Sequence, residues 1–281
     1  MSETSSTAML LLGGTGKIAR RLSPLLTARG VFVLLASRTP KKQSHSGCRG
    51  VRFDWLNPDT YQCPFDIPSI TISTIFLIPP LVPDAFPLIK VFIDIAIDKK
   101  VKRIVLLSGS VLHVGDGPAL NAVAEENFSE MNHHVTSITE QNCIISGTGN
   151  GKLPFISADD IAEVACLTMT DQTLHNTEYL LFGPELLSYD QVAEILSANI
   201  GRHISHAKIT QQEVAAGMIA GGMDEIYAKG LSELETYVKT GGEERMNDDV
   251  LKLTGRPPRS FKDYVQQCVK QNIWKVKEAN T

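Results

Sequence analysis

A glycine-rich turn near the start of the chain constrains its fold more than any other feature. The apolar run Leu10–Leu12 ends in the turn Gly13–Gly16, and a segment with apolar residues at helical spacing follows directly. This pattern predicts a strand, a tight turn and a helix. Glycines at such a turn let the backbone approach a diphosphate, and the helix presents free N–H groups and its positive dipole end to it. With Ala19, the spacing G-x-x-G-x-x-A is a short form of the dinucleotide fingerprint.

The composition is that of an ordinary globular protein. The chain has 281 residues, of which 43% are hydrophobic and 21% are charged. This length is enough for one large α/β domain, alone or with a smaller C-terminal extension. The net charge is −4 and no long basic run occurs, so nucleic acid is not an expected partner.

Cysteine usage and the absence of targeting patterns predict a cytoplasmic protein. The five cysteines are scattered without a C-x-x-C pair, which argues against a disulfide framework or a zinc site. The polar N-terminal residues lack the layout of a signal peptide. Prolines interrupt the apolar stretch 67–82, so no membrane span is expected.

Strands and helices are predicted to alternate through the first half. Continuous apolar strands separated by helices indicate a doubly wound parallel sheet of the Rossmann type. The predicted strands are 8–12, 31–36, 51–54, 70–77 and 103–107, and the predicted helices are 17–29, 87–100 and 118–130. We expect a dinucleotide-binding domain over residues 1–156.

Residues 157–281 are predicted to form a smaller, mainly helical substrate lobe that partly completes the sheet. Helix starts are expected at Ser157, Ser188, Thr210, Asp224 and Ser260, with a capping box at Ser188. Extended segments are expected at 178–182 and 203–209. Asp159-Asp160 resembles a catalytic pair, but its place in a first helical turn favours a capping role.

The end of the second strand indicates which dinucleotide binds. Enzymes selective for NAD(H) usually place an acid about 20 residues after the glycine turn. This chain has Ser37 and Arg38 there, followed by Lys41 and Lys42, and a hydroxyl and a guanidinium suit a 2′-phosphate. The prediction is NADP(H), and the alternative is a solvated loop with ordinary surface cations.

Further cofactor contacts are expected where the third, fourth and fifth strands end. A carboxylate at Asp54 would accept from the adenine amino group, or it is an ordinary turn carboxylate beside a half-buried Trp55. The residues at the end of the fourth strand would lie over the cofactor ribose, or they only terminate the strand. The predicted cofactor set is Gly13, Gly14, Thr15, Gly16, Lys17, Ile18, Ser37, Arg38, Asp54, Trp55, Leu77, Ile78, Pro79 and Ser108.

Ser108 stands where short-chain reductases hold a serine that hydrogen-bonds the substrate carbonyl. Such enzymes also need a Tyr–Lys pair, in which the Tyr donates the proton. No tyrosine or lysine occurs between Ser110 and Gly151, so carbonyl reduction through that triad is not available. A cationic iminium would need only hydride and electrostatic stabilisation by carboxylates.

Glu126 is the carboxylate we select for that role, with Ser108 as the other candidate catalytic residue. Glu125, Glu130, His133 and His134 lie nearby, and an exposed helix face is the alternative interpretation for most of this group. The histidines lack the spacing of a metal site, so no metal is expected.

Several motifs resemble the NmrA-like, atypical short-chain dehydrogenase/reductase family. Within it, they are most similar to the fungal ergot-alkaloid reductases of the agroclavine and festuclavine type. The motifs are GGTGK at 13–17, SADDIA at 157–162, NTEY at 176–179, GPELLSY at 183–189 and TGRPPR at 254–259. The resemblance implies an NADP-binding fold and reduction of a cyclic iminium on an indole alkaloid, a small-molecule partner, by a monomer or homodimer.

The chain departs from that family in its middle. Family members typically carry a strand before the Glu126-Asn127-Phe128 segment, and here Ala122–Glu125 runs straight into it, so that strand is expected to be missing. Two alternatives to a reductase stay open. One is a Pictet–Spengler-type cyclase that joins an indole-ethylamine to an aldehyde, with NADP as a structural part. The other is a regulatory protein that senses NADP(H).

Overall fold

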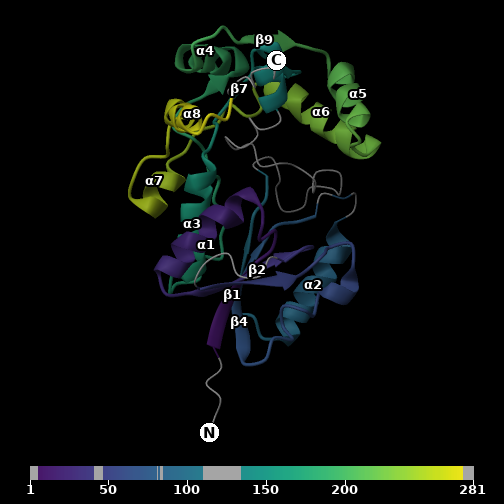
Figure 1. The fold of residues 1–281 in the computed structure, drawn as a ribbon, viewed down its shortest axis with the longest axis vertical. Helices are drawn as coiled ribbons and strands as arrows, with labels where there is room; N and C mark the ends of the chain where they lie inside the picture. The colour runs from purple at the N-terminus through teal and green to yellow at the C-terminus, as the bar shows by residue number, and fades with distance from the viewer. Residues whose placement is uncertain (1–5, 41–46, 81, 83–84, 110–133, 275–281) are drawn as a thin grey trace, which may run out of the picture. The chain divides into compact units, whose positions relative to one another are not determined.

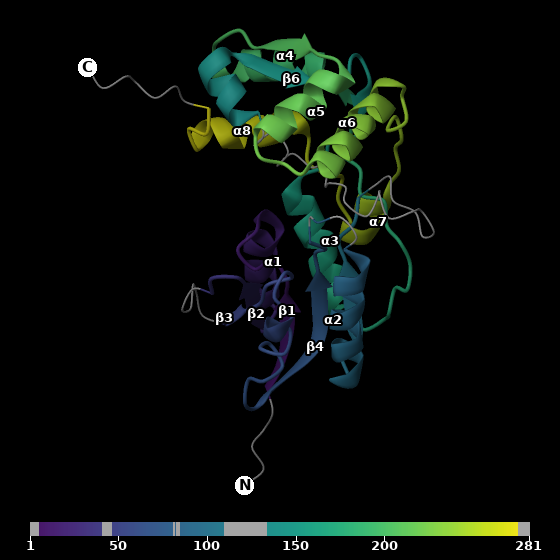
Figure 2. The same cartoon turned by 90° about the vertical axis from the view of Figure 1, so that its right-hand side faces the viewer.

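The computed structural model describes residues 6–40, 47–80, 82, 85–109 and 134–274 (Figures 1 and 2). The chain forms two compact units, each built from two segments. Unit 1 comprises Met1–Ala122 and Ala158–Glu178, and unit 2 comprises Val123–Ser157 and Tyr179–Thr281. The units are therefore interleaved along the sequence, whereas the predicted division is a single cut between residues 156 and 157.

Unit 1 contains a five-stranded parallel sheet, which confirms the predicted fold class. Its order is β3-β2-β1-β4-β5, so the chain winds outward from β1 in both directions and the switch lies between β1 and β4. The strands are β1 Ser6–Leu11, β2 Phe32–Ser37, β3 Cys48–Arg52, β4 Ile70–Leu77 and β5 Arg103–Leu106.

Helices cover both faces of this sheet (Figure 1). On one face, Phe92 and Ala96 of α2 (Phe86–Asp98) pack with the buried residues Leu10, Leu34 and Ile75 of three strands. The other face carries α1 (Lys17–Ala28) and α3 (Ala158–Thr170), which contact each other. Helix α3 belongs to unit 1 because it packs there, although it follows the predicted boundary.

Two further contacts hold α3 to the earlier part of the chain. Arg21 of α1 pairs with Asp159 at 2.8 Å between Nε and Oδ1. Arg103 of β5 donates to the backbone oxygens of Thr168 and Asp171, at the C-terminal end of α3. A first-turn acid and a C-terminal cation both suit the helix dipole, so these two contacts stabilise α3 where it packs.

Unit 2 is mainly helical. Its helices are the short π-helix Ser137–Gln141, α4 Tyr189–Ile200, α5 Gln211–Ala220, α6 Glu225–Lys239, α7 Asp249–Thr254 and α8 Phe261–Lys270. Strands β6 (Cys143–Ser146) and β9 (Ser205–Lys208) pair in parallel, and β7 (Lys152–Leu153) pairs antiparallel with β8 (Leu187–Ser188). The predicted capping box at Ser188 is present, and Thr210 forms a second one. The helices and strands of unit 2 contribute to a core of aliphatic and aromatic residues, including Phe155, Phe261 and Trp274.

Residues 178–182 do not form the predicted strand. Side chains hold the backbone of Leu180 instead, because its N–H donates to Asp249 Oδ2 and its carbonyl oxygen accepts from Asn247 Nδ2. A second set of expectations falls outside the described residues. These are the helix at 118–130 and the missing strand before Glu126. In the described part of the chain, no strand pairs with the outer edge of β5.

The glycine turn is predicted to stabilise the fold itself, apart from any ligand. A Cβ at Gly14 would lie 2.7 Å from the Leu35 backbone of β2. Gly14→Ala is therefore expected to lower the free energy of unfolding by at least about 2 kcal/mol, measured by urea denaturation. In the control Gly217→Ala, on α5, the added Cβ meets nothing within 4 Å, so we expect a gain of up to about 1 kcal/mol. Equal effects at the two sites would contradict this account.

Candidate functional site

The glycine turn lies at the carboxyl end of β1, where a doubly wound sheet binds its ligand. Gly13 adopts φ +65°, which favours glycine, and its exposed backbone borders Ile78. Gly14 N–H donates to Ala36 O at 2.7 Å, and Gly16 N–H donates to Gly13 O at 2.7 Å. The turn is thus fixed by its own hydrogen bonds and by β2 before any ligand arrives.

Helix α1 begins in a way that suits an anion. Its N-cap is Gly16, which offers no side-chain cap, and the first turn contains no acid. Uncapped N–H groups and the dipole end favour a phosphate there. Thr15 is exposed and Lys17 is half-buried at this end, whereas Ile18 is buried and supports the turn from inside.

The predicted 2′-phosphate residues lie beside this turn, at the end of the neighbouring strand. Ser37 is the last residue of β2 and is partly exposed, and Arg38 follows it with an exposed side chain. In the described residues no hydrogen bond or ion pair engages the Arg38 guanidinium, which leaves it available to an anionic ligand. The backbone oxygen of Ser37 accepts from Phe53 N–H, which ties β2 to the start of the Asp54 turn.

Asp54 and Trp55 form a hydrogen-bonded turn after β3. Asp54 Oδ1 accepts from Leu56 N–H at 3.1 Å, so one of its oxygens stabilises the turn itself. The Trp55 indole Nε1 donates to Ile78 O at 3.1 Å, and this bond joins the ends of β3 and β4. The Trp55 ring also packs edge-on against Phe53, Tyr61 and Phe92.

The remaining predicted residues differ in how they could act. Leu77 is 1% exposed in the core, so its side chain stabilises the sheet, whereas Ile78 and Pro79 are partly exposed at the strand end. Ser108 is exposed just beyond β5, at the same carboxyl edge. Glu126, the selected carboxylate, lies outside the described residues.

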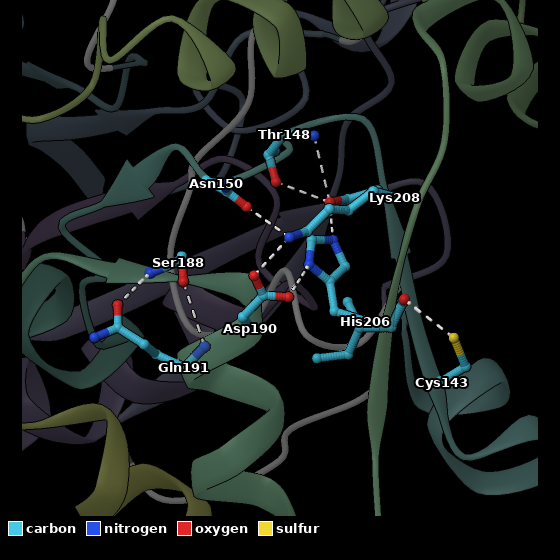
Figure 3. A network of polar contacts seen from close by, with 10 residues as sticks. Cys143, Thr148, Asn150, Ser188, Asp190, Gln191, His206 and Lys208 are labelled. Carbon is cyan, nitrogen blue, oxygen red and sulfur yellow. Dashed lines mark hydrogen bonds and ion pairs between the residues drawn. The ribbon is translucent and has the colours of Figure 1, made fainter.

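Unit 2 holds a polar network that the sequence did not predict (Figure 3). The His206 side chain is fully buried, and its Nδ1 lies 3.0 Å from Asp190 Oδ1 while Nε2 lies 2.8 Å from Ser146 Oγ. Ser146 Oγ also bonds Thr148 Oγ1 at 2.8 Å. Lys208 Nζ donates to Asp190 Oδ2 at 2.7 Å. The residues come from β6, its following loop, α4 and β9.

The order Asp190–His206–Ser146 has the contacts of a hydrolytic triad, but Ser146 is only 2% exposed. A substrate cannot reach its oxygen, so the network is structural. Burial lowers the pKa of the His206 imidazole, against the opposing effect of Asp190. A hydrogen bond from the Lys208 ammonium and, to a smaller extent, one with His206 hold the pKa of the Asp190 carboxyl below its usual value. A neutral His206 can donate to Asp190 and accept from Ser146, which satisfies both ring nitrogens.

Two further titratable groups in unit 2 lie on one face of α6. Burial raises the pKa of the Glu235 carboxyl, although Gly147 N–H donates a hydrogen bond to it. Burial also raises the pKa of the Tyr227 phenol, which is 8% exposed and whose oxygen has no hydrogen-bond partner among the residues that the structure describes. The sequence predicts a helix that contains residues 227 and 235, but it carries no signal that these two side chains are buried.

No group of three or more His, Cys, Asp or Glu side chains in the described part of the chain could hold a metal ion. Among the helices described, none is both long and apolar enough to cross a membrane.

The sheet order, the glycine turn and the open start of α1 define a Rossmann-type dinucleotide-binding fold. Solved structures agree with this class. The Citrobacter sp. triphenylmethane reductase superposes with a TM-score of 0.73 at 20% identity, covering 92% of this chain and 99% of that one.

The chain belongs to the NmrA-like family, whose model matches residues 121–278. It is 38% identical to festuclavine synthase II of Penicillium roqueforti, covering 95% of this chain and 99% of that protein. It is 35% identical to agroclavine dehydrogenase of Claviceps fusiformis, covering 96% and 99%. The first alignment spans 290 positions, more than the 281 residues here, so the relative has residues that this chain lacks.

The stability of unit 2 is expected to fall in mild acid because of His206. The folded pKa of His206 is lowered, so the unfolded chain takes up its proton first as the pH falls below about 6.5. The free energy of unfolding should therefore drop between pH 7.5 and 5.5, by at most about 1.4 kcal/mol per pH unit from this group. His206→Gln should reduce that slope in urea titrations. An unchanged slope would show that other groups cause it.

Tyr227→Phe is expected to stabilise the protein. The substitution removes a buried hydroxyl that has no partner in the described part of the chain, and it keeps the ring, so it should raise the free energy of unfolding by about 1 kcal/mol. The matched control is Tyr61→Phe, because Tyr61 donates to Trp55 O at 2.7 Å and is 1% exposed. That variant should be destabilised by about the same amount. Both are measured by chemical denaturation, and a loss at both sites would contradict the prediction.

Proposed function

We propose that the protein binds NADP(H) at the carboxyl edge of the unit 1 sheet. The observation that carries this proposal is the preformed turn 13–16 beside Arg38, whose guanidinium no other described residue engages, at the end of β2 where no acid stands. The turn and α1 would hold the diphosphate, and Ser37 and Arg38 would hold the 2′-phosphate. The Citrobacter reductase of the same fold was solved with NADP(H).

We further propose that the protein is an NADPH-dependent oxidoreductase that reduces a C=N bond. Its substrate would be a cyclic iminium intermediate in fungal indole alkaloid biosynthesis of the ergot type. The names of the relatives, festuclavine synthase and agroclavine dehydrogenase, support the alkaloid class. The sequence supports an iminium as the substrate. Residues 111–150 contain no tyrosine and no lysine, so the Tyr–Lys pair that protonates a carbonyl oxygen in short-chain reductases is absent from this segment.

The chain's own residues would bind and orient in this reaction. The bound dinucleotide supplies the hydride, and the substrate carbon needs no proton donor because it is already electrophilic. Ser108, exposed at the end of β5, would contact the substrate, and Glu126 would stabilise its charge. The proposal includes residues 1–156 as the cofactor part, 157–281 as the substrate part, and a cytoplasmic monomer or homodimer.

The reductase proposal predicts that a cyclic indole iminium causes loss of NADPH absorbance at 340 nm, with a reduced amine as product. The measurement is a steady-state assay with product identification by mass spectrometry. Ring formation from an indole-ethylamine and an aldehyde without NADPH loss would indicate a cyclase instead. Tight NADP(H) binding without turnover of any substrate would indicate a sensor.

Arg38→Ala is expected to weaken NADPH binding about 10- to 100-fold, because it removes a charged hydrogen-bond donor to the 2′-phosphate. Affinity for NADH should hardly change. Calorimetry on both nucleotides measures this, with Arg49→Ala as the control, since Arg49 is an exposed arginine on the neighbouring strand β3. Equal losses for NADPH and NADH would refute the assigned role of Arg38.

A further inference from the structure

The indole N–H of Trp55 forms a hydrogen bond that joins two separated strand ends of unit 1. Trp55 follows β3, and its Nε1 donates at 3.1 Å to the backbone oxygen of Ile78, directly after β4. The sheet order places β2 and β1 between these two strands. The bond therefore spans the carboxyl edge of the sheet and connects positions on both sides of the glycine turn that follows β1.

The Trp55 side chain is held so that its N–H has a fixed direction. The half-buried ring packs edge-on against Phe53 and Phe92, at 5.0 Å and 5.5 Å between ring centroids. The Trp55 backbone oxygen accepts at 2.7 Å from the hydroxyl of Tyr61, which is 1% exposed. Because core residues hold both the ring and the backbone, the indole is a rigid donor to Ile78.

Ile78 connects this bond to the glycine turn. Pro79 follows Ile78, and a residue before proline is restricted to extended backbone, which limits the rotation of the Ile78 carbonyl. The Ile78 side chain lies against the turn, since its Cδ1 would be 3.3 Å from a Cβ at Gly13. A displacement of Ile78 would therefore disturb the first residue of the turn that is proposed to hold the diphosphate.

The other end of the bond lies next to Asp54, the residue predicted to accept from the adenine amino group. Asp54 N–H donates to Thr60 Oγ1 at 2.8 Å, and Asp54 Oδ1 accepts from Leu56 N–H at 3.1 Å. Asp54 Oδ2 has no donor among the described residues, which leaves this oxygen for the adenine. These bonds hold the Asp54 turn by themselves, without the Trp55 indole.

We propose that Trp55 is a positioning residue for the dinucleotide, an inference that rests on the proposed binding of NADP(H). Its bond to Ile78 fixes the separation between the Asp54 turn, on the adenine side, and the turn 13–16, on the diphosphate side. A dinucleotide occupies both turns at once, so a separation fixed in advance reduces the ordering cost of binding. Trp55 acts through Ile78 and needs no contact of its own with the cofactor. The alternative is that Trp55 only packs in the core.

Trp55→Phe separates these two roles, because it removes the N–H and keeps an aromatic ring. Two ligands are compared by calorimetry on the full chain. NADPH spans both turns, whereas adenosine 2′-monophosphate contains the adenine and the 2′-phosphate without the diphosphate. Trp55→Phe should weaken NADPH binding about tenfold and change the affinity for the monophosphate less than about twofold. A loss of packing alone would not distinguish the two ligands.

Trp274→Phe is the matched control. Trp274 is the other tryptophan of the chain, is 3% exposed, and its Nε1 has no partner in the part of the chain that the structure describes. This variant should change neither affinity. It also leaves Trp55 as the sole tryptophan, so biosynthetic replacement by benzothienylalanine keeps the ring shape there and removes only the N–H. That protein should show the same selective loss of NADPH affinity, and it serves as the test if Trp55→Phe does not fold.

Ile78→Val tests the connection from its other end. It removes the Cδ1 atom that packs at Gly13 and keeps the backbone oxygen that Trp55 bonds. NADPH binding should weaken about threefold, with the affinity for the monophosphate unchanged. The double variant Trp55→Phe, Ile78→Val should lose no more NADPH affinity than Trp55→Phe alone, because both changes interrupt the same connection.

Unchanged NADPH affinity on removal of the N–H, equal losses for the two ligands, or additive losses in the double variant would overturn the inference and leave the proposed cofactor in place. No binding of NADPH by the wild type would overturn both. Urea denaturation of each variant checks that the protein is folded under the conditions of the titration.

Discussion

The contact between Gly14 and the backbone of β2 is the constraint on which the rest of unit 1 depends. Gly14 N–H bonds Ala36 O, and no side chain fits between the turn and Leu35. This contact fixes the turn between β1 and α1 against β2, and Gly16 at the N-cap leaves the start of α1 without a side-chain cap. The glycine fingerprint is thus first a packing requirement between two strands, and an anion site results from the geometry that this packing imposes.

Much of unit 1 could be predicted from the sequence because its signals are local. Apolar strands, a glycine turn and helical spacing predict the parallel sheet of unit 1. In unit 2 the one comparably local signal, Ser188 with Gln191, predicts a capping box that the structure contains. The interleaving of the two units could not be predicted. It depends on contacts far apart in the chain, such as Arg21 with Asp159, which no short pattern records.

In the candidate site too, local sequence signals were sufficient for some residues and not for others. The turn residues and Arg38 follow from a motif and its spacing, so the sequence located them. The composition of residues 178–182 predicts a strand, but in the structure the side chains of Asp249 and Asn247 bond the backbone of Leu180. Glu235 and His206 matter because of their burial, and burial is decided by which helices and strands meet. The sequence shows the residue types without the environment that changes their chemistry.

The return of α3 to the sheet has a consequence for synthesis on the ribosome. The N-terminal 109 residues supply the five strands, but α1 lacks its neighbouring helix until residues 158–170 have emerged. Until then, apolar surface on one face of the nascent sheet is uncovered, and nascent chains in that condition are prone to self-association. Unit 2 residues 123–157 are also made before their partners in 179–281. Neither unit is complete until the second of its two segments has been made, so truncation before residue 158 removes α3 from unit 1 and the segment 179–281 from unit 2.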